Sequence, residues 1–150
     1  MKQVKIMRGC SGSGKSTHTR NLVREAKAND ISWVVVSADA HFLDEEGNYN
    51  FDPSKLGEAH GSCFVQCIDA LRNNIGLVIV DNTNTTAVEI APYMAAAAAY
   101  GYDAEILLVE ADVDVAIERN VHGVPAEAVK RQAKNIQQEK LPPWWKQTKV

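Results

Sequence analysis

Short, mostly apolar runs alternate along this chain with longer stretches in which apolar residues recur every three or four positions. The runs lie at residues 4–7, 33–36, 77–80 and 104–109 and are rich in valine, isoleucine and leucine. Runs of this kind are typical of strands buried on both faces of a parallel sheet. The longest of the other stretches, residues 56–71, predicts an amphipathic helix. This alternation predicts an α/β fold, a three-layer sandwich in which a mostly parallel sheet of four to five strands carries helices on both faces.

Capping residues predict where several of these helices begin. Asp52 before Pro53 marks a helix start, because aspartate caps free N–H groups and proline fits the first helical position. Thr86 and Glu89 have the spacing of a capping box. Asp112 is expected to cap a short helix after the fourth strand.

Length and composition narrow the class of protein. A chain of 150 residues with 45% hydrophobic residues fits one domain, residues 1–150, with a single core. The net charge of −3 argues against broad, non-specific nucleic-acid binding, although a local basic groove is compatible with it. No apolar run approaches the roughly 20 residues that span a membrane. The first residues pass directly into a strand, so we expect no signal peptide and a cytoplasmic protein.

One glycine-rich stretch predicts a nucleotide-binding site. Residues 9–16 read G-x-x-x-x-G-K-S and lie between an expected strand and an expected helix, which is the P-loop arrangement. The glycines let backbone N–H groups turn inward around an anion, and the helix N-terminus adds further free N–H groups. Lys15 would neutralise the β- and γ-phosphates of ATP, and the Ser16 hydroxyl would hold Mg²⁺. The expected nucleotide-binding residues are Gly9, Cys10, Ser11, Gly12, Ser13, Gly14, Lys15, Ser16 and Thr17.

Two aspartates follow buried strands and are expected at the same edge of the sheet. Asp39 comes after the second strand and Asp81 ends the third, and ligands of parallel α/β sheets bind outside the carboxyl ends of the strands. One carboxylate would hold Mg²⁺ and the other would accept a proton from an acceptor hydroxyl; position alone permits either assignment. Asn82 and Asn84, in the loop after Asp81, are candidate substrate contacts, as is His60.

A helix–break–helix arrangement after the fourth strand predicts a short lid. The first of these helices ends near Arg119, residues 120–125 break the chain, and the last helix runs over about residues 126–138. An arginine on a lid can stabilise the charge of a phosphoryl group in transfer. Arg119 is therefore the candidate catalytic residue of the lid.

His60, Cys63 and Cys67 share one helical face, a spacing that also occurs in metal sites. Three soft ligands without a fourth do not complete a zinc site, and the same residues lie within the apolar stripe of residues 56–71. We therefore expect buried core cysteines and no structural metal.

Taken together, these residues resemble the kinase domain of phage-type 5′-hydroxyl polynucleotide kinases and their short AAA-like P-loop relatives. The resemblance implies that Asp39 is the general base on the acceptor 5′-hydroxyl, that Asp81 supports the active site and lid, and that Arg119 reaches ATP. Two features depart from the family's pattern: Phe42 stands where an arginine would hold the acceptor's phosphate, and the lid is shorter. The matching segments are residues 9–17, 37–39, 51–60, 80–84 and 119–125.

The combined prediction is a kinase that uses ATP and Mg²⁺ to phosphorylate a hydroxyl, with the 5′-hydroxyl of a single-stranded nucleic acid end or of a nucleotide as the leading acceptor. A small-metabolite kinase, acting on a sugar-like or antibiotic hydroxyl, is an alternative, because the acidic residues 44–46 and the net charge of −3 would repel a polyanion. A binding module that hydrolyses ATP without transfer is a third. The sequence leaves the oligomeric state open.

Overall fold

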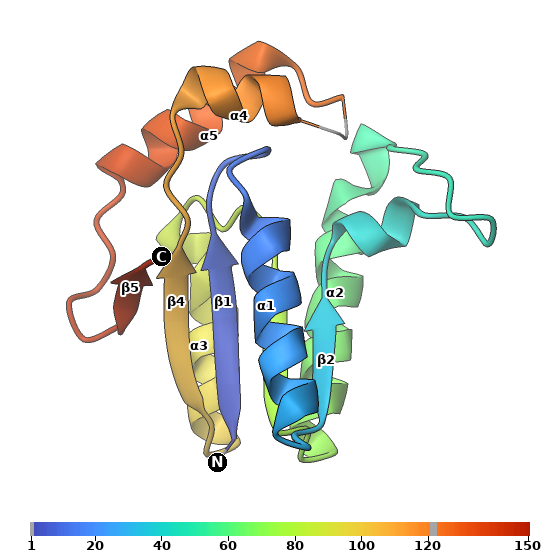
Figure 1. The fold of residues 1–150 in the computed structure, drawn as a ribbon, viewed down its shortest axis with the longest axis vertical. Helices are drawn as coiled ribbons and strands as arrows, with labels where there is room; N and C mark the ends of the chain where they lie inside the picture. The colour runs from blue at the N-terminus through green and yellow to red at the C-terminus, as the bar shows by residue number, and fades with distance from the viewer. Residues whose placement is uncertain (1, 121–122) are drawn as a thin grey trace.

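The structure, a computed structural model, describes residues 2–120 and 123–150. Its centre is a five-stranded sheet in which every pair of neighbouring strands is parallel (Figure 1). The strand order is β2-β3-β1-β4-β5, so β1 lies in the middle. The predicted P-loop α/β fold is confirmed. The strands are β1 (Gln3–Arg8), β2 (Trp33–Val36), β3 (Leu77–Asp81), β4 (Asp103–Leu108) and β5 (Gln147–Lys149).

Helices cover both faces of the sheet (Figure 1). Side chains alternate along β1, so that Val4 and Ile6 pack toward α2 and α3 whereas Met7 packs with Ala26 of α1. Among the described residues, no helix is both long enough and apolar enough to cross a membrane. The α-helices are α1 (Lys15–Ala28), α2 (Leu56–Arg72), α3 (Ala87–Ala99), α4 (Val113–Arg119) and α5 (Ala126–Gln138), and two short 3-10 helices are η1 (Asp39–Phe42) and η2 (Pro53–Lys55).

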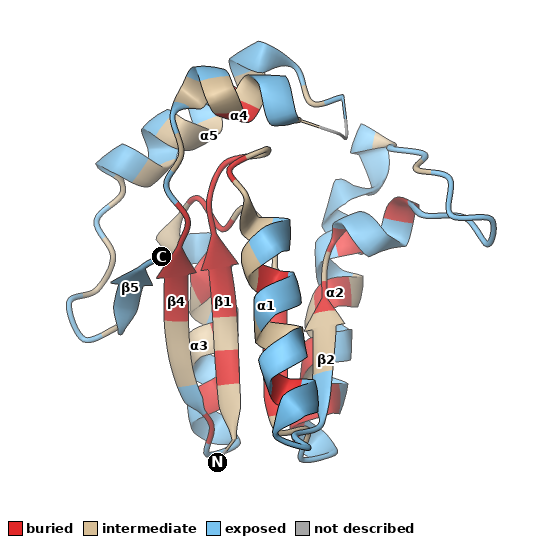
Figure 2. Ribbon diagram, in the orientation of Figure 1, coloured by how far each residue is buried: buried red, intermediate tan, exposed pale blue. Residues whose placement is uncertain are grey.

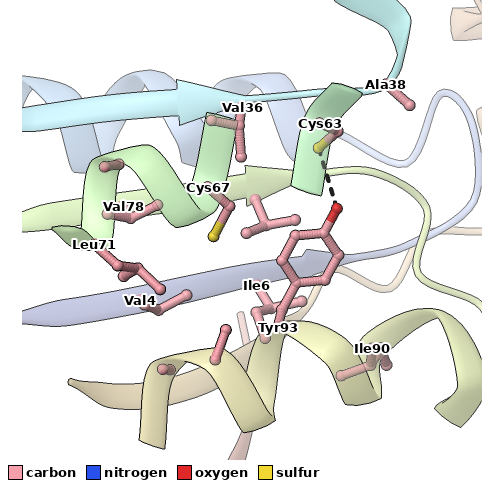
Figure 3. Packing of buried hydrophobic residues seen from close by; sticks show 14 of the residues in the cluster. Val4, Ile6, Val36, Ala38, Cys63, Cys67, Leu71, Val78, Ile90 and Tyr93 are labelled. Atoms are coloured by element: carbon pink, nitrogen blue, oxygen red, sulfur yellow. Dashed lines mark hydrogen bonds between the residues drawn. The ribbon is translucent and has the colours of Figure 1, made fainter. Parts of the chain in front are cut away.

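The larger core lies between the sheet and the α2–α3 layer, where the central strands are the most buried part of the molecule (Figure 2). Cys63 and Cys67 of α2 sit in this core among β-strand side chains (Figure 3). The Tyr93 hydroxyl of α3 donates a hydrogen bond to Cys63 Sγ at 3.2 Å. Burial, together with the neighbouring Cys63, raises the pKa of Cys67 to about 12, so its thiol stays protonated. Both cysteines are core residues, as the apolar stripe predicts.

Of the three predicted helix starts, one is found as predicted, one begins with a 3-10 turn, and one lacks the predicted capping box. The Asp112 carboxylate accepts two backbone N–H groups and caps α4. Asp52 also caps, but the turn after it is the 3-10 helix η2, and α2 begins only at Leu56. Thr86 is the N-cap residue of α3, yet its side chain caps no backbone group. Its hydroxyl instead donates to the Glu89 carboxylate at 3.3 Å, so the predicted capping box is not formed.

The lid helices α4 and α5 lie across the carboxyl edge of the sheet, next to the loop that follows β1 (Figure 1). Cys10 of that loop forms a buried cluster with Ala116 of α4 and Val129 of α5. The Ser11 N–H donates to Gln132 Oε1 of α5 at 2.9 Å. The lid is therefore packed onto the phosphate loop. Two residues of the predicted break, 121 and 122, lie outside the described residues.

Candidate active site

The phosphate loop joins β1 to α1 at the carboxyl edge of the central strand. Gly12 and Gly14 have φ angles of +81° and +106°, which glycine adopts without strain. Four backbone N–H groups of the loop donate no hydrogen bond within the described part of the chain, those of Gly12, Gly14, Lys15 and Ser16. Four free donors at a helix N-terminus form a site for a phosphate group.

Ser13 is a second indication that this loop accommodates an anion. The residue is 5% exposed, and its Oγ has no hydrogen-bond partner among the described residues. An unpaired buried hydroxyl costs about 1–3 kcal/mol, and a phosphate oxygen would satisfy it. The loop residues therefore fit the triphosphate of a nucleotide.

Lys15 extends back along the loop that it follows. Its Nζ donates to the carbonyl oxygens of Gly9 at 2.8 Å and Cys10 at 2.9 Å. Burial lowers the pKa of Lys15, and the charges of Asp81, Cys10 and Asp39 oppose that shift. Asp39 and Asp81 lie at the same edge of the sheet, because β2 and β3 are parallel neighbours and the residues next to the two aspartates are joined by the hydrogen bond from the Ala38 N–H to Asn82 Oδ1 at 2.8 Å.

Asp81 is the more enclosed of the two carboxylates. Its Oδ2 accepts a hydrogen bond from the Thr19 hydroxyl of α1 at 3.3 Å. Burial raises the pKa of Asp81, against the effects of Lys15 and Thr19, and the charge of Asp39 raises it further. A carboxylate held by a helix residue and close to Lys15 is suited to binding a phosphate-bound cation, either directly or through water. Ser16, at the start of α1, is exposed and free to contribute its hydroxyl.

Asp39 is exposed and begins η1. Two residues, Ser37 and Ala38, separate it from the end of β2 at Val36. Its Oδ1 accepts a hydrogen bond from the Tyr49 hydroxyl at 3.2 Å. Burial raises the pKa of Tyr49 to about 12, with further contributions from the charge and hydrogen bond of Asp39. The Tyr49 hydroxyl is therefore protonated at neutral pH and acts as the donor. The exposed Asp39 and the enclosed Asp81 thus differ in environment, which their positions in the sequence did not reveal.

Asn82 and Asn84 hold the loops of the site together. The Asn82 side chain accepts the Ala38 N–H at 2.8 Å and donates to Cys63 Sγ at 3.5 Å. Asn84 is buried, has φ +47°, and donates from Nδ2 to the Met7 carbonyl at 2.7 Å. These contacts fix the loop after β3 against the ends of β1 and β2.

Two other predicted residues, His60 and Arg119, lie outside the phosphate loop. His60, on α2, is exposed and lines a cavity of about 400 Å³ together with Asn84. Arg119 is the last residue of α4 and is exposed. The structure thus brings His60 and Asn84 to one cavity, and it keeps Arg119 on the lid.

Arg8 is a structural part of the site that the sequence analysis missed. This buried arginine precedes the phosphate loop and donates to the carbonyl oxygens of Asn84 and Thr85, each at 2.9 Å. It also donates to Gln147 Oε1 of β5 at 3.2 Å. Tyr49 was missed as well. Neither has a local sequence signal, because their partners are distant in the sequence or lie in an irregular loop.

A glycine-rich loop between the central parallel strand and the first helix, with free N–H groups at its end, defines a P-loop nucleotide-binding protein. Comparison with known proteins identifies the family within this class. Residues 4–141 match the AAA domain family, and this chain belongs to that family.

One curated relative and two solved structures extend this comparison. NEDD4-binding protein 2 from Homo sapiens is 34% identical over 138 residues, which are 88% of this chain and 7% of that protein. A chain of the Pnkp1/Rnl/Hen1 RNA repair complex has a TM-score of 0.72 and 20% identity, covering 91% of this chain and 44% of that one. The Mycobacterium tuberculosis APS kinase CysC in complex with AMPPNP and APS has a TM-score of 0.64 and 17% identity, covering 99% and 88%.

This chain therefore spans a small part of NEDD4-binding protein 2 and less than half of the RNA repair chain. At these identities the two structures establish a shared fold. The sequence analysis expects a resemblance to the kinase domain of phage-type 5′-hydroxyl polynucleotide kinases and their short AAA-like P-loop relatives, and the family match confirms its AAA-like P-loop part.

Proposed function

We propose that this protein is a kinase that transfers the γ-phosphoryl group of ATP to an acceptor hydroxyl, with Mg²⁺ as cofactor. The observation that carries the proposal is that two carboxylates, Asp39 and Asp81, stand at the carboxyl ends of the neighbouring parallel strands β2 and β3, at the edge of the sheet where the phosphate loop lies. A phosphate site alone would serve any nucleotide-binding protein. A second, exposed carboxylate next to it is what phosphoryl transfer to a hydroxyl requires.

The donor side follows from the loop. The free N–H groups of residues 12 and 14–16, with the Ser13 hydroxyl, would bind the phosphates. Lys15 would add its positive charge to them. The Ser16 hydroxyl and the Asp81 carboxylate are the groups that would hold Mg²⁺, which neutralises phosphate charge when bound. Arg119 would approach the same phosphates from the lid.

The acceptor side depends on Asp39. Its exposed carboxylate is free to accept the proton of a hydroxyl, whereas Asp81 is enclosed by Thr19 and Lys15. We therefore assign Asp39 as general base and Asp81 as cation ligand.

The leading acceptor is the 5′-hydroxyl of a polynucleotide or nucleotide. The similarity of this chain to a component of an RNA repair complex supports this choice. A small-metabolite kinase is the second candidate, and Phe42 favours it: this residue is buried in an aromatic cluster, where the related pattern would place an arginine for an acceptor phosphate.

The test is transfer of label from γ-labelled ATP to a panel of 5′-hydroxyl DNA, 5′-hydroxyl RNA, nucleosides and sugars. We expect one class to acquire label, and Asp39→Asn to lower kcat on it by roughly 100-fold or more, the contribution of a general base. The matched control is Asp69→Asn, an exposed aspartate on α2, which should retain wild-type kcat. Wild-type turnover by Asp39→Asn would refute the base assignment, and ATP hydrolysis with no labelled acceptor would refute the kinase.

A further inference from the structure

We propose that Tyr49 is a positioning residue of the acceptor side: its hydroxyl fixes one oxygen of the Asp39 carboxylate so that the other oxygen faces the acceptor hydroxyl. The inference rests on the proposed function, because it gives Tyr49 a role in the proton transfer to Asp39. The contact that motivates it is the hydrogen bond of 3.2 Å from the Tyr49 hydroxyl to Asp39 Oδ1.

The chain between these two residues is folded back so that Tyr49 returns to the start of η1. Leu43 and Tyr49 form an isolated antiparallel bridge. The N–H of Asn50 donates to the Phe42 carbonyl at 2.8 Å, which closes the loop at its base. Gly47, at φ +84°, makes the turn that the return requires.

The tip of this loop is held by one side chain. Asp44 Oδ1 accepts the N–H groups of Glu46 at 2.9 Å and Asn48 at 2.8 Å. These hydrogen bonds lower the pKa of Asp44, the bond from Asn48 first. Asp44 is therefore ionised at neutral pH and supports the turn that delivers Tyr49.

The ring of Tyr49 is held from two directions. It meets the Phe42 ring edge-on, with centroids 6.1 Å apart, and stacks on Phe51 with an interplanar angle of 9°. Phe42 is itself part of the main core, so the ring is anchored to the body of the protein. Phe42 therefore has a different role from the arginine of the family pattern, because it packs against Tyr49, which in turn orients Asp39.

The consequence for the reaction is geometric. The acceptor O–H bond breaks as its oxygen bonds to the γ-phosphorus, and the proton passes to Asp39 Oδ2. The bond from the γ-phosphorus to the β,γ-bridging oxygen breaks, and that oxygen leaves with ADP. Tyr49 donates to Oδ1 throughout and restricts rotation of the carboxylate, which keeps Oδ2 within reach of the acceptor. Tyr49 itself exchanges no proton in this step.

The test is the variant Tyr49→Phe, which keeps the aromatic contacts and removes the hydroxyl. Loss of a hydrogen bond to a charged group should lower kcat roughly tenfold, with the KM for ATP unchanged. The control is Tyr100→Phe, an exposed tyrosine at the end of α3 that should retain wild-type kinetics. In an Asp39→Asn background, Tyr49→Phe should cause no further loss, because the two residues act as one unit.

Three other outcomes would contradict the positioning role of Tyr49 or the kinase assignment. If wild-type protein transfers phosphoryl groups and Tyr49→Phe keeps its kcat, the positioning role is refuted and the kinase assignment stands. A fall in kcat matched by an equal loss of folded protein, measured by circular dichroism, also refutes it. If wild-type protein labels no acceptor in the panel, the proposed function fails and takes this inference with it.

Discussion

At the scale of single residues, Gly12 joins the phosphate loop to the lid. Its φ of +81° is one that residues with side chains rarely adopt, and a Cβ placed there would clash with the carbonyl oxygen of Ala116 in α4. The residue therefore allows the turn of the loop and the close approach of the lid helix at the same time. Gly61, on α2, has open space around it and faces neither constraint.

This contrast predicts opposite effects of the same substitution. Gly12→Ala should lower the free energy of unfolding by about 1–3 kcal/mol, because the new methyl group strains the backbone and pushes against Ala116. Gly61→Ala should raise it by about 0.5–1 kcal/mol, as alanine favours a helix interior. Urea unfolding measures both values. Equal midpoints for Gly12→Ala and wild-type protein would contradict the close approach of α4.

At the scale of elements, β5 is a strand that is stabilised by its contacts with other parts of the sheet. All three of its residues are exposed, and it forms the edge of the sheet by pairing with β4. Glu105 of β4 accepts hydrogen bonds from Lys5 at 2.6 Å and Thr148 at 2.7 Å, and lies 3.2 Å from Lys146. This cluster ties β1, β4 and β5 together through one carboxylate.

The cluster predicts how stability depends on pH. Partial burial would raise the pKa of Glu105, but the hydrogen bonds from Lys5, Thr148 and Lys146 outweigh it and lower that pKa from 4.5 to about 2. The carboxylate is thus stabilising when ionised, and its contribution is lost as the pH falls from about 4.5 toward about 2.

We expect Glu105→Gln to flatten the fall in unfolding free energy over this pH range, measured by urea unfolding at several pH values. The exposed Glu118 of α4 provides the control, since Glu118→Gln should leave the profile of wild-type protein unchanged. A Glu105→Gln profile as steep as that of wild-type protein would show that other groups govern acid sensitivity.

At the scale of the whole molecule, charge bears on the choice of acceptor. The net charge is −3, and the loop at residues 44–46 is acidic, which opposes a long polyanion. A polynucleotide acceptor must then be bound through local phosphate contacts near its end.

Salt dependence separates the two candidate acceptors. For a 5′-hydroxyl oligonucleotide held through about three phosphates, affinity should fall roughly tenfold or more between about 50 and 200 mM salt, because binding releases counterions. A neutral nucleoside or sugar should show little change. The measurement is KM for each acceptor at constant Mg²⁺, and a flat profile for the oligonucleotide would favour the small-metabolite kinase.

Much of the donor side could be predicted from the sequence because it depends on short-range order. The phosphate loop needs only a strand, eight residues and a helix in succession. The buried strands are apolar runs, and their shared carboxyl edge follows from the parallel sheet. The positions of Asp39 and Asp81 beside Lys15 follow from the same rule.

Other features depend on contacts between distant parts of the chain and have no local pattern. β5 is a strand because β4 offers it an edge, although Gln147, Thr148 and Lys149 carry no apolar signal. Tyr49 meets Asp39 only because an irregular loop folds back over ten residues. Local sequence patterns are therefore enough to predict the α/β fold and the phosphate loop, because each residue type there has a local physical role. Only the folded chain distinguished the exposed Asp39 from the enclosed Asp81, because burial depends on contacts between residues far apart in the sequence.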